Sequence, residues 1–552
     1  MPNDPRGFEA FLRLIDPLRP LSGALEGLLA SGGDSRLALD PATRLNGYGC
    51  RLFPRPEAFT FASSTATSIS DRAYADVAGA RQKLLRDAQL IGLDRAVDAH
   101  MEWQRIELRQ ILGLENSGCE IVFSPSGTDS QLHALFLVRA LLGTPLVSLI
   151  AASDETGGGT SFATRGRHFS AFTALGVPVA KGEQVQGLAD GVIGAHVPLR
   201  DGFGRLRPLD EVDGDIAHAV TREVAAGKRV VLWAMDSSKF GLRSPSEDCL
   251  RWIADAAGDD VMIVIDACQA RLSRRRLRWY LDRGFPVLIT GSKFFTGAPF
   301  SGALLVPQNL VERCAAVGGV PEGLGAYTGQ YDWPERFAGI RRGLPVQINL
   351  GTLLRWSAAL TEMRDYYAVP DSFREFALTQ FAQTVPQLIV SAPCLEPMPL
   401  PEEEFASFDN EEFATRTIFP FFVRRRDERL SYAAASILYR ALNDDVAPLL
   451  PATLPPMLRL LAARRCHIGQ AVAVPDGTGG SHGALRISAG ARLVSETWRN
   501  DDILAARENL RAEFDQVRAI VEKLVLLVRY FDEIEPAYTA AQTPDNYRVS
   551  AA

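Results

Sequence analysis

A lysine set among small and aromatic residues is the first candidate for chemistry. Lys293 lies in the segment Thr290-Gly-Ser-Lys293-Phe-Phe-Thr-Gly-Ala-Pro, directly after the apolar run Pro286-Val-Leu-Ile. Partial desolvation lowers the pKa of such a lysine and makes its amine nucleophilic toward a carbonyl group. Taken alone, the segment is also typical of a surface lysine in a glycine-rich turn.

A carboxylate follows a second apolar run. Asp266 comes directly after Val261-Met-Ile-Val-Ile and begins the segment Asp266-Ala-Cys-Gln269. A carboxylate at the end of a buried strand is costly unless a cation or a hydrogen-bond donor pairs with it, so the pattern predicts a cationic partner. Capping of the following loop is the alternative.

A possible anion cradle follows a third run. Ile121-Val-Phe leads into Ser124-Pro-Ser-Gly127-Thr128-Asp129-Ser130. The glycine lets the backbone approach an anion, and the free N–H groups at the start of a helix favour phosphate. On its own, the sequence is more typical of a plain helix cap.

The elements around these segments predict where they meet. Short apolar, β-branched runs begin near residues 120, 145, 229, 261, 286 and 302, and helix-length segments separate them. This pattern predicts an α/β domain with a mostly parallel sheet that is buried on both faces. Ligands bind at the carboxyl ends of such strands. An anion cradle, a carboxylate and a lysine at one sheet edge together favour pyridoxal phosphate as the cofactor.

The sequence also predicts three parts. Residues 1–69 form an N-terminal extension rich in Pro, Gly and Arg, with an amphipathic stretch at 8–18. A large α/β domain spans 70–345, and a smaller α+β C-terminal domain spans 346–552. The C-terminal part contains an acidic loop at 402–405 and a long terminal helix near 501–531.

These motifs resemble those of fold-type I pyridoxal-phosphate enzymes, in particular the class V aminotransferase and cysteine desulfurase branch. In that family a D-x-x-Q pair precedes a small-Gly-His-Lys segment. Asp266-Ala-Cys-Gln269 and Thr290-Gly-Ser-Lys293 are similar to it, except that Ser292 replaces the histidine. The resemblance covers roughly residues 70–500.

The resemblance implies a role for each matching residue. Lys293 would form the internal aldimine, Asp266 would keep the ring nitrogen protonated, and Gln269 would bond the phenolic oxygen. Lys293, once released by the substrate, would move the Cα proton. The cofactor phosphate would be bound by Gly127, Thr128, Asp129, Thr290 and Ser292.

The chain departs from the family pattern at three further positions. Thr156 stands where a ring-stacking histidine is usual, and Ser238 stands where an asparagine is usual. Gly343-Leu-Pro345 replaces a Gly-Thr-Pro segment that the family contributes across the dimer interface. An aromatic face could come from one of three residues, although residues of these types are more often packed in a core: Phe162, His168 and His133.

Two residues of the C-terminal part are further candidates. Arg486 resembles the family arginine that grips the substrate α-carboxylate, a task that suits the planar guanidinium fork. Cys466, between Arg465 and His467, lies about where desulfurases carry the sulfur-accepting cysteine. A thiolate in that setting would be activated, whereas a buried cysteine would be inert.

The sequence therefore predicts an enzyme that acts on an α-amino-acid substrate through an external aldimine and a Cα carbanion. The reaction would be transamination, elimination or replacement. The modified pocket favours a specialised biosynthetic reaction, with carbon–carbon bond formation and a second substrate as options. Sulfur transfer through Cys466 is the alternative. A non-enzymatic scaffold is disfavoured because Asp266 and Lys293 are both retained. The resemblance also implies a homodimer with the active site at its interface.

Composition excludes other classes. The 552 residues are 47% hydrophobic and 23% charged, as in ordinary globular proteins, and the net charge of −7 offers no general attraction for nucleic acid or anionic membranes. Seven scattered cysteines without a C-x-x-C pair argue against a disulfide framework or a zinc ribbon and favour the cytoplasm. No signal peptide, membrane span, H-E-x-x-H, G-x-S-x-G or Walker motif is present, and no metal is predicted.

Overall fold

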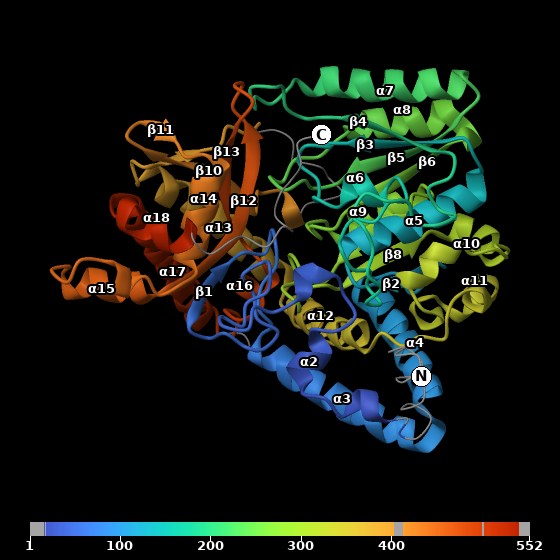
Figure 1. Cartoon of the computed structure of the whole chain (residues 1–552), viewed down its shortest axis with the longest axis horizontal. Coiled ribbons are helices and arrows are strands. Elements are labelled where there is room, and N and C mark those ends of the chain that lie inside the picture. Colours follow the sequence, from blue (N-terminus) through green and yellow to red (C-terminus); the bar gives the residue numbers. More distant parts are fainter. Residues whose placement is uncertain (1–15, 17, 402–411, 500–501, 540–552) are drawn as a thin grey trace, which may run out of the picture.

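A computed structural model describes residues 16, 18–401, 412–499 and 502–539 (Figure 1). Most of the amphipathic stretch predicted at 8–18 and the acidic loop predicted at 402–405 lie outside these residues.

The larger of two sheets has seven strands in the order β2-β8-β7-β6-β5-β3-β4. β8 runs antiparallel to β2 and β7, and the other neighbours are parallel. The strands are β2 (Glu120–Ser124), β3 (Leu146–Ala151), β4 (Val192–Val197), β5 (Arg229–Met235), β6 (Val261–Asp266), β7 (Val287–Thr290) and β8 (Gly302–Val306). The predicted mostly parallel sheet is confirmed. β4 was not predicted, because it is an edge strand whose side chains are largely exposed.

Both faces of this sheet are buried because its apolar side chains alternate between two cores. Val231 and Val264 pack on the same side as α5 (Gly127–Leu142), whereas Leu232 and Ile263 belong to the opposite core. The remaining helices associated with this sheet are α6 (Thr160–Ala163), α7 (Leu209–Ala225), α8 (Glu247–Ala257), α9 (Arg274–Asp282), α10 (Gln308–Ala315) and α11 (Ala338–Gly343).

The long helical pattern after residue 70 forms two helices, α3 (Asp71–Ile91) and α4 (Leu93–Ile111). Gly92 separates them with a φ of +86°, a conformation that glycine adopts without strain. Both helices contact α12 (Leu350–Ala368), and this layer runs along one edge of the molecule in Figure 1.

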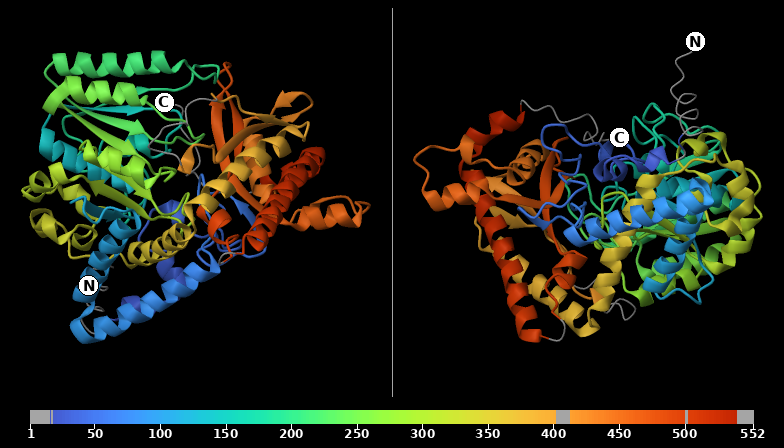
Figure 2. Two further views of the ribbon diagram at one scale, coloured as in Figure 1. Left: turned by 180° about the vertical axis from the view of Figure 1, so that it is seen from behind. Right: turned by 90° about the horizontal axis from the view of Figure 1, so that it is seen from below.

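The second sheet has the order β1-β12-β13-β10-β11, and β9 pairs with β10. In the left view of Figure 2, its orange strands lie apart from the green strands of the large sheet. Its strands are β1 (Ala58–Phe61), β9 (Leu395–Pro397), β10 (Ile418–Arg425), β11 (Glu428–Arg429), β12 (Arg465–Pro475) and β13 (Ser481–Ser488). β1 comes from the predicted N-terminal extension and pairs in parallel with β12. Part of the extension is therefore built into the second sheet.

Helices cover this second sheet, as the α+β prediction requires. α14 (Tyr432–Leu442) contacts β12 and β13, and α17 (Ile503–Arg529), the predicted terminal helix, contacts α14 and α13 (Asp371–Val390). The other helices are α2 (Leu25–Leu29), α15 (Pro456–Ala463), α16 (Ala491–Ser495) and α18 (Phe531–Thr539). Among the described ranges, no helix combines the length and the apolar character that crossing a membrane requires.

Candidate active site

Three predicted segments meet at one edge of the large sheet. Ser124 at the end of β2 and Thr290 at the end of β7 both pair with Gly302 of β8. Asp266 at the end of β6 pairs with Leu288 of β7. The Thr290 hydroxyl donates to the Cys268 carbonyl at 2.7 Å. The cradle, the carboxylate and the segment before Lys293 are therefore neighbours, as the strand-end argument predicted.

Gly127 begins α5 where the backbone is tightly packed. A Cβ atom added to Gly127 would lie 2.5 Å from Cys268 Sγ and 3.4 Å from Thr290 Cγ2. Only glycine lets the start of α5 approach the loop after β6 this closely.

Gly127→Ala should therefore destabilise the protein, although alanine is the better helix former by about 1 kcal/mol. We expect a loss of about 1–3 kcal/mol in the free energy of unfolding because the new methyl overpacks against Cys268. Adding Cys268→Ala to Gly127→Ala should restore most of that loss, measured by denaturant unfolding. Strictly additive effects of the two substitutions would contradict this close packing.

Asp266 is buried and hydrogen-bonded. Its carboxylate accepts from the Gln131 amide at 3.0 Å and from the Cys268 N–H at 3.1 Å. Gln131 also donates to Thr160 at 3.1 Å, and the Thr156 hydroxyl donates to Thr160 at 3.0 Å. Thr156 thus belongs to a hydrogen-bonded chain that ends on Asp266. Sequence analysis missed Gln131, although it lies one helical turn after Gly127 on the same face of α5.

Lys293 lies in a cluster of positive charges. Burial lowers the pKa of its amine, Asp266 and Cys268 oppose this shift, and Arg486 and Arg271 add to it. Burial, with Arg486 and Lys293, also lowers the pKa of Lys239 to about 8. We call these four residues, Lys239, Arg271, Lys293 and Arg486, the cationic cluster.

Sequence analysis missed two members of this cluster. Lys239 follows β5 in the same segment as Ser238, so the rule of inspecting strand ends could have found it. The sequence contains two basic runs, at 271–278 and at 424–429, and runs of this kind predict solvated faces. Arg271 and Arg276 of the first run are buried, so this prediction is wrong for them. The second basic run, at 424–429, has the predicted exposure at Arg426, whose side chain is 80% exposed.

Arg486 of β13 reaches the cluster from the second sheet. Its guanidinium donates to the Lys239 carbonyl at 3.1 Å, the Thr65 hydroxyl at 2.9 Å and the Gln470 carbonyl at 2.8 Å. These acceptors are all neutral, and within the described part of the chain its Nε has no hydrogen-bond partner. Burial lowers its pKa to about 10.

The side chains of Gln269 and Ser238 form hydrogen bonds with neighbouring residues. The Gln269 amide donates to the Ser64 carbonyl at 3.1 Å, and its oxygen accepts from Arg271 at 2.7 Å. The Ser238 hydroxyl donates to Glu155 at 2.5 Å and accepts the N–H of Phe240 at 3.2 Å. Both residues therefore order the loops around the site through the contacts seen here.

The predicted phosphate ligands differ in availability. Across the described ranges, the hydroxyls of Thr128 and Ser292 have no hydrogen-bond partner, although both residues are buried. Asp129 instead forms part of the cap of α5: its N–H donates to the Ser126 hydroxyl at 3.3 Å, and its carboxylate accepts from that hydroxyl at 2.5 Å. Burial raises the pKa of Asp129 to about 7.

This raised pKa predicts a stability difference that depends on pH. The folded protein keeps a proton on Asp129 that the unfolded chain, with a pKa near 3.8, has already lost. The resulting stabilisation is complete below that value and is lost as the pH rises through about 7. Relative to Asp129→Asn, the wild type should lose thermal stability between pH 5 and roughly pH 8. A constant difference in melting temperature over this range would contradict the prediction.

An arginine of the N-terminal part also reaches the start of α5. Arg36 donates to the Ser126 hydroxyl at 3.3 Å and forms an ion pair with Asp34 at 2.5 Å. No local sequence signal could reveal this contact, because the two segments are far apart in the chain.

The residues considered for stacking on a cofactor ring have other partners. His133 is fully buried against Trp333, with ring centroids 5.4 Å apart, and burial lowers its pKa to about 3. The His168 ring stacks on Tyr327 at 5.8 Å. Phe162 lies 5.2 Å from the Lys181 ammonium. In the segment that replaces Gly-Thr-Pro, Gly343 ends α11 and Leu344 is buried.

Cys466 is fully buried in β12. Burial raises the pKa of its thiol to about 11, against weak opposing effects of Lys523, Arg464 and Arg55. None of these residues belongs to the cationic cluster. Burial therefore disfavours the activated thiolate that was considered for this position.

No protein-family model matches the sequence, and a search of curated proteins gives no significant match. The fold is similar to a solved structure titled NifS-like protein, with 14% identity, 84% of this chain and 98% of that chain covered, and a TM-score of 0.45. It is also similar to the cysteine desulfurase CsdA from Escherichia coli, with 13% identity, 85% and 95% covered, and a TM-score of 0.47. A third structure, Oryza sativa TDC with PLP, has 14% identity, 85% and 84% covered, and a TM-score of 0.46. At this level of similarity, the function of this chain rests on its own side chains.

Proposed function

We propose that this chain is a pyridoxal-phosphate-dependent enzyme that acts on an α-amino-acid substrate. The observation that supports this most is the cationic cluster beside Asp266. Among the described residues, no ion pair joins Lys239, Arg271, Lys293 or Arg486 to a carboxylate. Glu155, which acts on Lys239, is ion-paired with Arg200 at 2.7 Å. Enclosing unpaired positive charges is costly, so the cluster favours anionic ligands.

The chemistry of the donor set fits this cofactor. Asp266 would face the ring nitrogen, Lys293 would hold the cofactor covalently, and the start of α5 would accept the phosphate. The hydroxyls of Thr128, Thr290 and Ser292 would complete the phosphate site. Pyridoxal phosphate, when bound, supplies an electron sink for a bond at the substrate Cα.

The residues of the chain would then act on the substrate. Arg486 would bind the α-carboxylate through its guanidinium fork. The lowered pKa of Lys293 increases the fraction of neutral amine, which can take a proton from Cα. Gln131 would position Asp266, and Gln269 would hold the loop that carries Arg271.

The finer features of the proposal come from the departures at Thr156, Ser238 and Ser292. They favour a specialised biosynthetic transferase or lyase reaction, such as carbon–carbon bond formation with a second substrate. We also propose a homodimer with the site at its interface. We further propose that the chain divides at 69/70 and 345/346 into an N-terminal extension, a large domain and a small C-terminal domain. A cytoplasmic location is also part of this proposal, because all seven cysteines are free.

The test is a panel of α-amino acids added singly to the purified protein supplied with pyridoxal phosphate. We expect the cofactor absorption to change with a small group of them, and mass spectrometry of the products then identifies the bond that is broken or formed. A protein that binds no pyridoxal phosphate, or one whose cofactor responds to no amino acid, would overturn the proposal.

A further inference from the structure

An arginine of the N-terminal part lies between the two segments that would bind the cofactor phosphate. Arg36 donates to the hydroxyl of Ser126, the N-cap residue of α5, at 3.3 Å. Its guanidinium also lies 5.0 Å from the ring centroid of Phe300, in the loop between β7 and β8 that carries Lys293. We call this loop, residues 291–301, the lysine loop. Arg36 therefore lies against both the start of α5 and the lysine loop.

Buried contacts hold the chain just before Arg36. Arg355 of α12 is fully buried and donates to the carbonyls of Gly32 and Phe300, each at 2.7 Å. One side chain thus binds both the N-terminal part and the lysine loop. Asn349, which caps α12, donates to the same Gly32 carbonyl at 3.1 Å. The turn that precedes Arg36 is therefore held in place against α12 and the lysine loop.

Two neighbours orient the guanidinium of Arg36. The buried carboxylate of Asp34 accepts from its Nε at 2.8 Å and from its Nη2 at 2.5 Å. The Tyr48 hydroxyl accepts from its Nη1 at 3.3 Å. Nη2 donates in addition to Ser126, and the side chain of Arg36 remains 24% exposed. The ion pair with Asp34 therefore directs the guanidinium toward the start of α5 without enclosing it completely.

The hydroxyls proposed to bind the phosphate bring no positive charge. Thr128 and Ser292 are 9% and 7% exposed, and among the described residues their hydroxyls have no hydrogen-bond partner. These hydroxyls and the free N–H groups of α5 can bind an anion, but they are neutral. Lys293 would be used for the covalent linkage. Because a phosphate group carries up to two negative charges, its burial requires a nearby cation.

The charge of Arg36 acts at this end of α5. Burial and Asp34 raise the pKa of Asp129 to about 7, and the hydrogen bond from Ser126 and the charge of Arg36 oppose this shift. The raised pKa of Asp129 limits the negative charge beside the helix start near neutral pH. Arg36 is therefore placed to compensate the charge of a phosphate bound there.

We propose that Arg36 is a positioning residue of the phosphate site: it joins the start of α5 to the lysine loop and supplies positive charge that favours the cofactor phosphate. Part of the N-terminal segment would thus contribute to cofactor binding. This inference rests on the proposed function and deepens it. Loss of the Arg36 guanidinium should weaken binding of the phosphate group selectively, because the proposed partners of the cofactor ring lie elsewhere, at Asp266 and Lys293.

The test compares pyridoxal phosphate with pyridoxal, which lacks the phosphate group. Equilibrium dialysis against the full-length protein gives the affinity for each, and the ratio of the two affinities measures the phosphate preference. Arg36→Gln should reduce this ratio about 10-fold and leave the affinity for pyridoxal nearly unchanged. Arg36→Lys, which keeps the charge but not the planar fork, should retain part of the preference. A purely structural defect would weaken the binding of both ligands and would not change the ratio.

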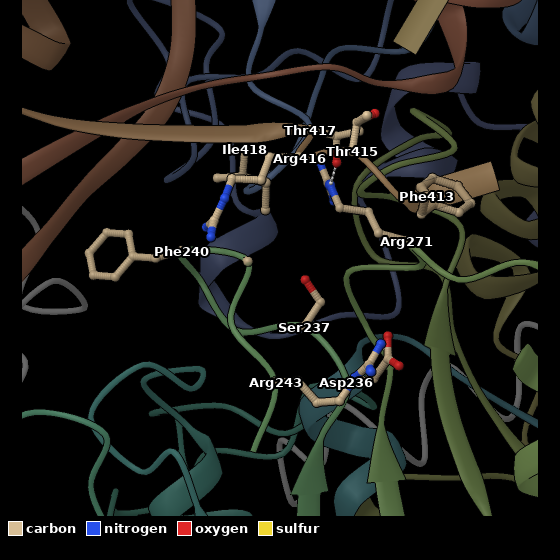
Figure 3. Close-up of a pocket in the computed structure, with 11 residues that line it drawn as sticks. Asp236, Ser237, Phe240, Arg243, Arg271, Phe413, Thr415, Arg416, Thr417 and Ile418 are labelled. Atoms are coloured by element: carbon tan, nitrogen blue, oxygen red, sulfur yellow. Dashed lines mark hydrogen bonds between the residues drawn. The ribbon is translucent and has the colours of Figure 1, made fainter. Parts of the chain in front are cut away.

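Two other arginines are matched controls. Arg271→Gln removes a positive charge that acts on Lys293, but its guanidinium donates to Thr417, just before β10, at 2.9 Å (Figure 3). This variant should change the ratio less than Arg36→Gln does. Arg44→Gln, at an exposed arginine of the N-terminal part, should leave the ratio unchanged. An unchanged ratio in Arg36→Gln, or an equal change in Arg271→Gln, would overturn the inference.

Inorganic phosphate separates a failure of this inference from a failure of the proposed function, because its binding needs no aldehyde. The melting temperature of the protein without added cofactor is measured in sodium phosphate and in sodium chloride of equal ionic strength. We expect phosphate to stabilise the wild type more than Arg36→Gln. If neither pyridoxal phosphate nor pyridoxal binds, the proposed function fails and this measurement decides the inference. Stabilisation that depends on Arg36 would then support it, and its absence would overturn it.

Discussion

Lys293→Ala is expected to abolish the visible absorption of covalently bound pyridoxal phosphate and to reduce turnover by roughly 10²- to 10⁴-fold. The amine is the group proposed both to hold the cofactor and to move the Cα proton, so one substitution removes both functions. Its position supports these roles, because burial, together with the charges of Arg486 and Arg271, lowers its pKa against the opposing charge of Asp266. Absorption spectra and steady-state rates of the purified variant measure the two effects.

Two other lysines serve as controls. Lys228→Ala removes a surface lysine that forms an ion pair with Glu223 at 2.7 Å, and it should leave spectrum and rate unchanged. Lys239→Ala removes a neighbouring positive charge and should weaken ligand binding without removing the covalent linkage. If Lys293→Ala retains the visible band and Lys239→Ala loses it, the cofactor is linked to Lys239, and the proposed role of Lys293 is wrong.

Asp266→Asn is expected to produce the second large effect, a roughly 10- to 100-fold loss of cofactor affinity. The substitution keeps the size of the side chain but removes the negative charge that would face the ring nitrogen. It also removes a charge that raises the pKa of Lys293, so that pKa should fall further. Equilibrium binding of pyridoxal phosphate and a pH titration of the cofactor absorption measure these changes.

The matched control for this prediction is Asp282→Asn. Asp282 is an exposed carboxylate whose side chain is 63% accessible, and it lies 3.3 Å from Arg278. Its replacement should change neither the cofactor affinity nor the titration. An Asp266→Asn variant with unaltered affinity and an unaltered titration would mean that Asp266 does not face the cofactor.

Much of the large sheet could be predicted from the sequence because its central strands are buried on both faces. Continuous apolar runs such as Val261-Met-Ile-Val-Ile leave few other possibilities. The edge strand β4 (Val192–Val197) was not predicted, because its side chains are largely exposed and do not form a continuous apolar run. The pairing of β1 with β12 could not be predicted either, since a parallel pair between residues about 400 positions apart has no local signal.

The site was predictable to the extent that its residues follow strands. Asp266 and Thr290 come directly after apolar runs, Gly127 follows a third run after a short Ser-Pro-Ser segment, and topology brings those ends together. Arg271 was misassigned because a basic run is normally solvated, whereas folding buries it against neutral acceptors. Arg36 depends on chain segments that meet only in three dimensions.

The measurement that tests the central claim most directly is reductive trapping. The protein is saturated with pyridoxal phosphate, treated with borohydride to make the lysine–cofactor linkage permanent, and digested for peptide mass spectrometry. We expect the cofactor mass on the peptide that contains Lys293, and on no other lysine. A label on Lys239 or on a surface lysine, or no label at all, would contradict the proposed active site.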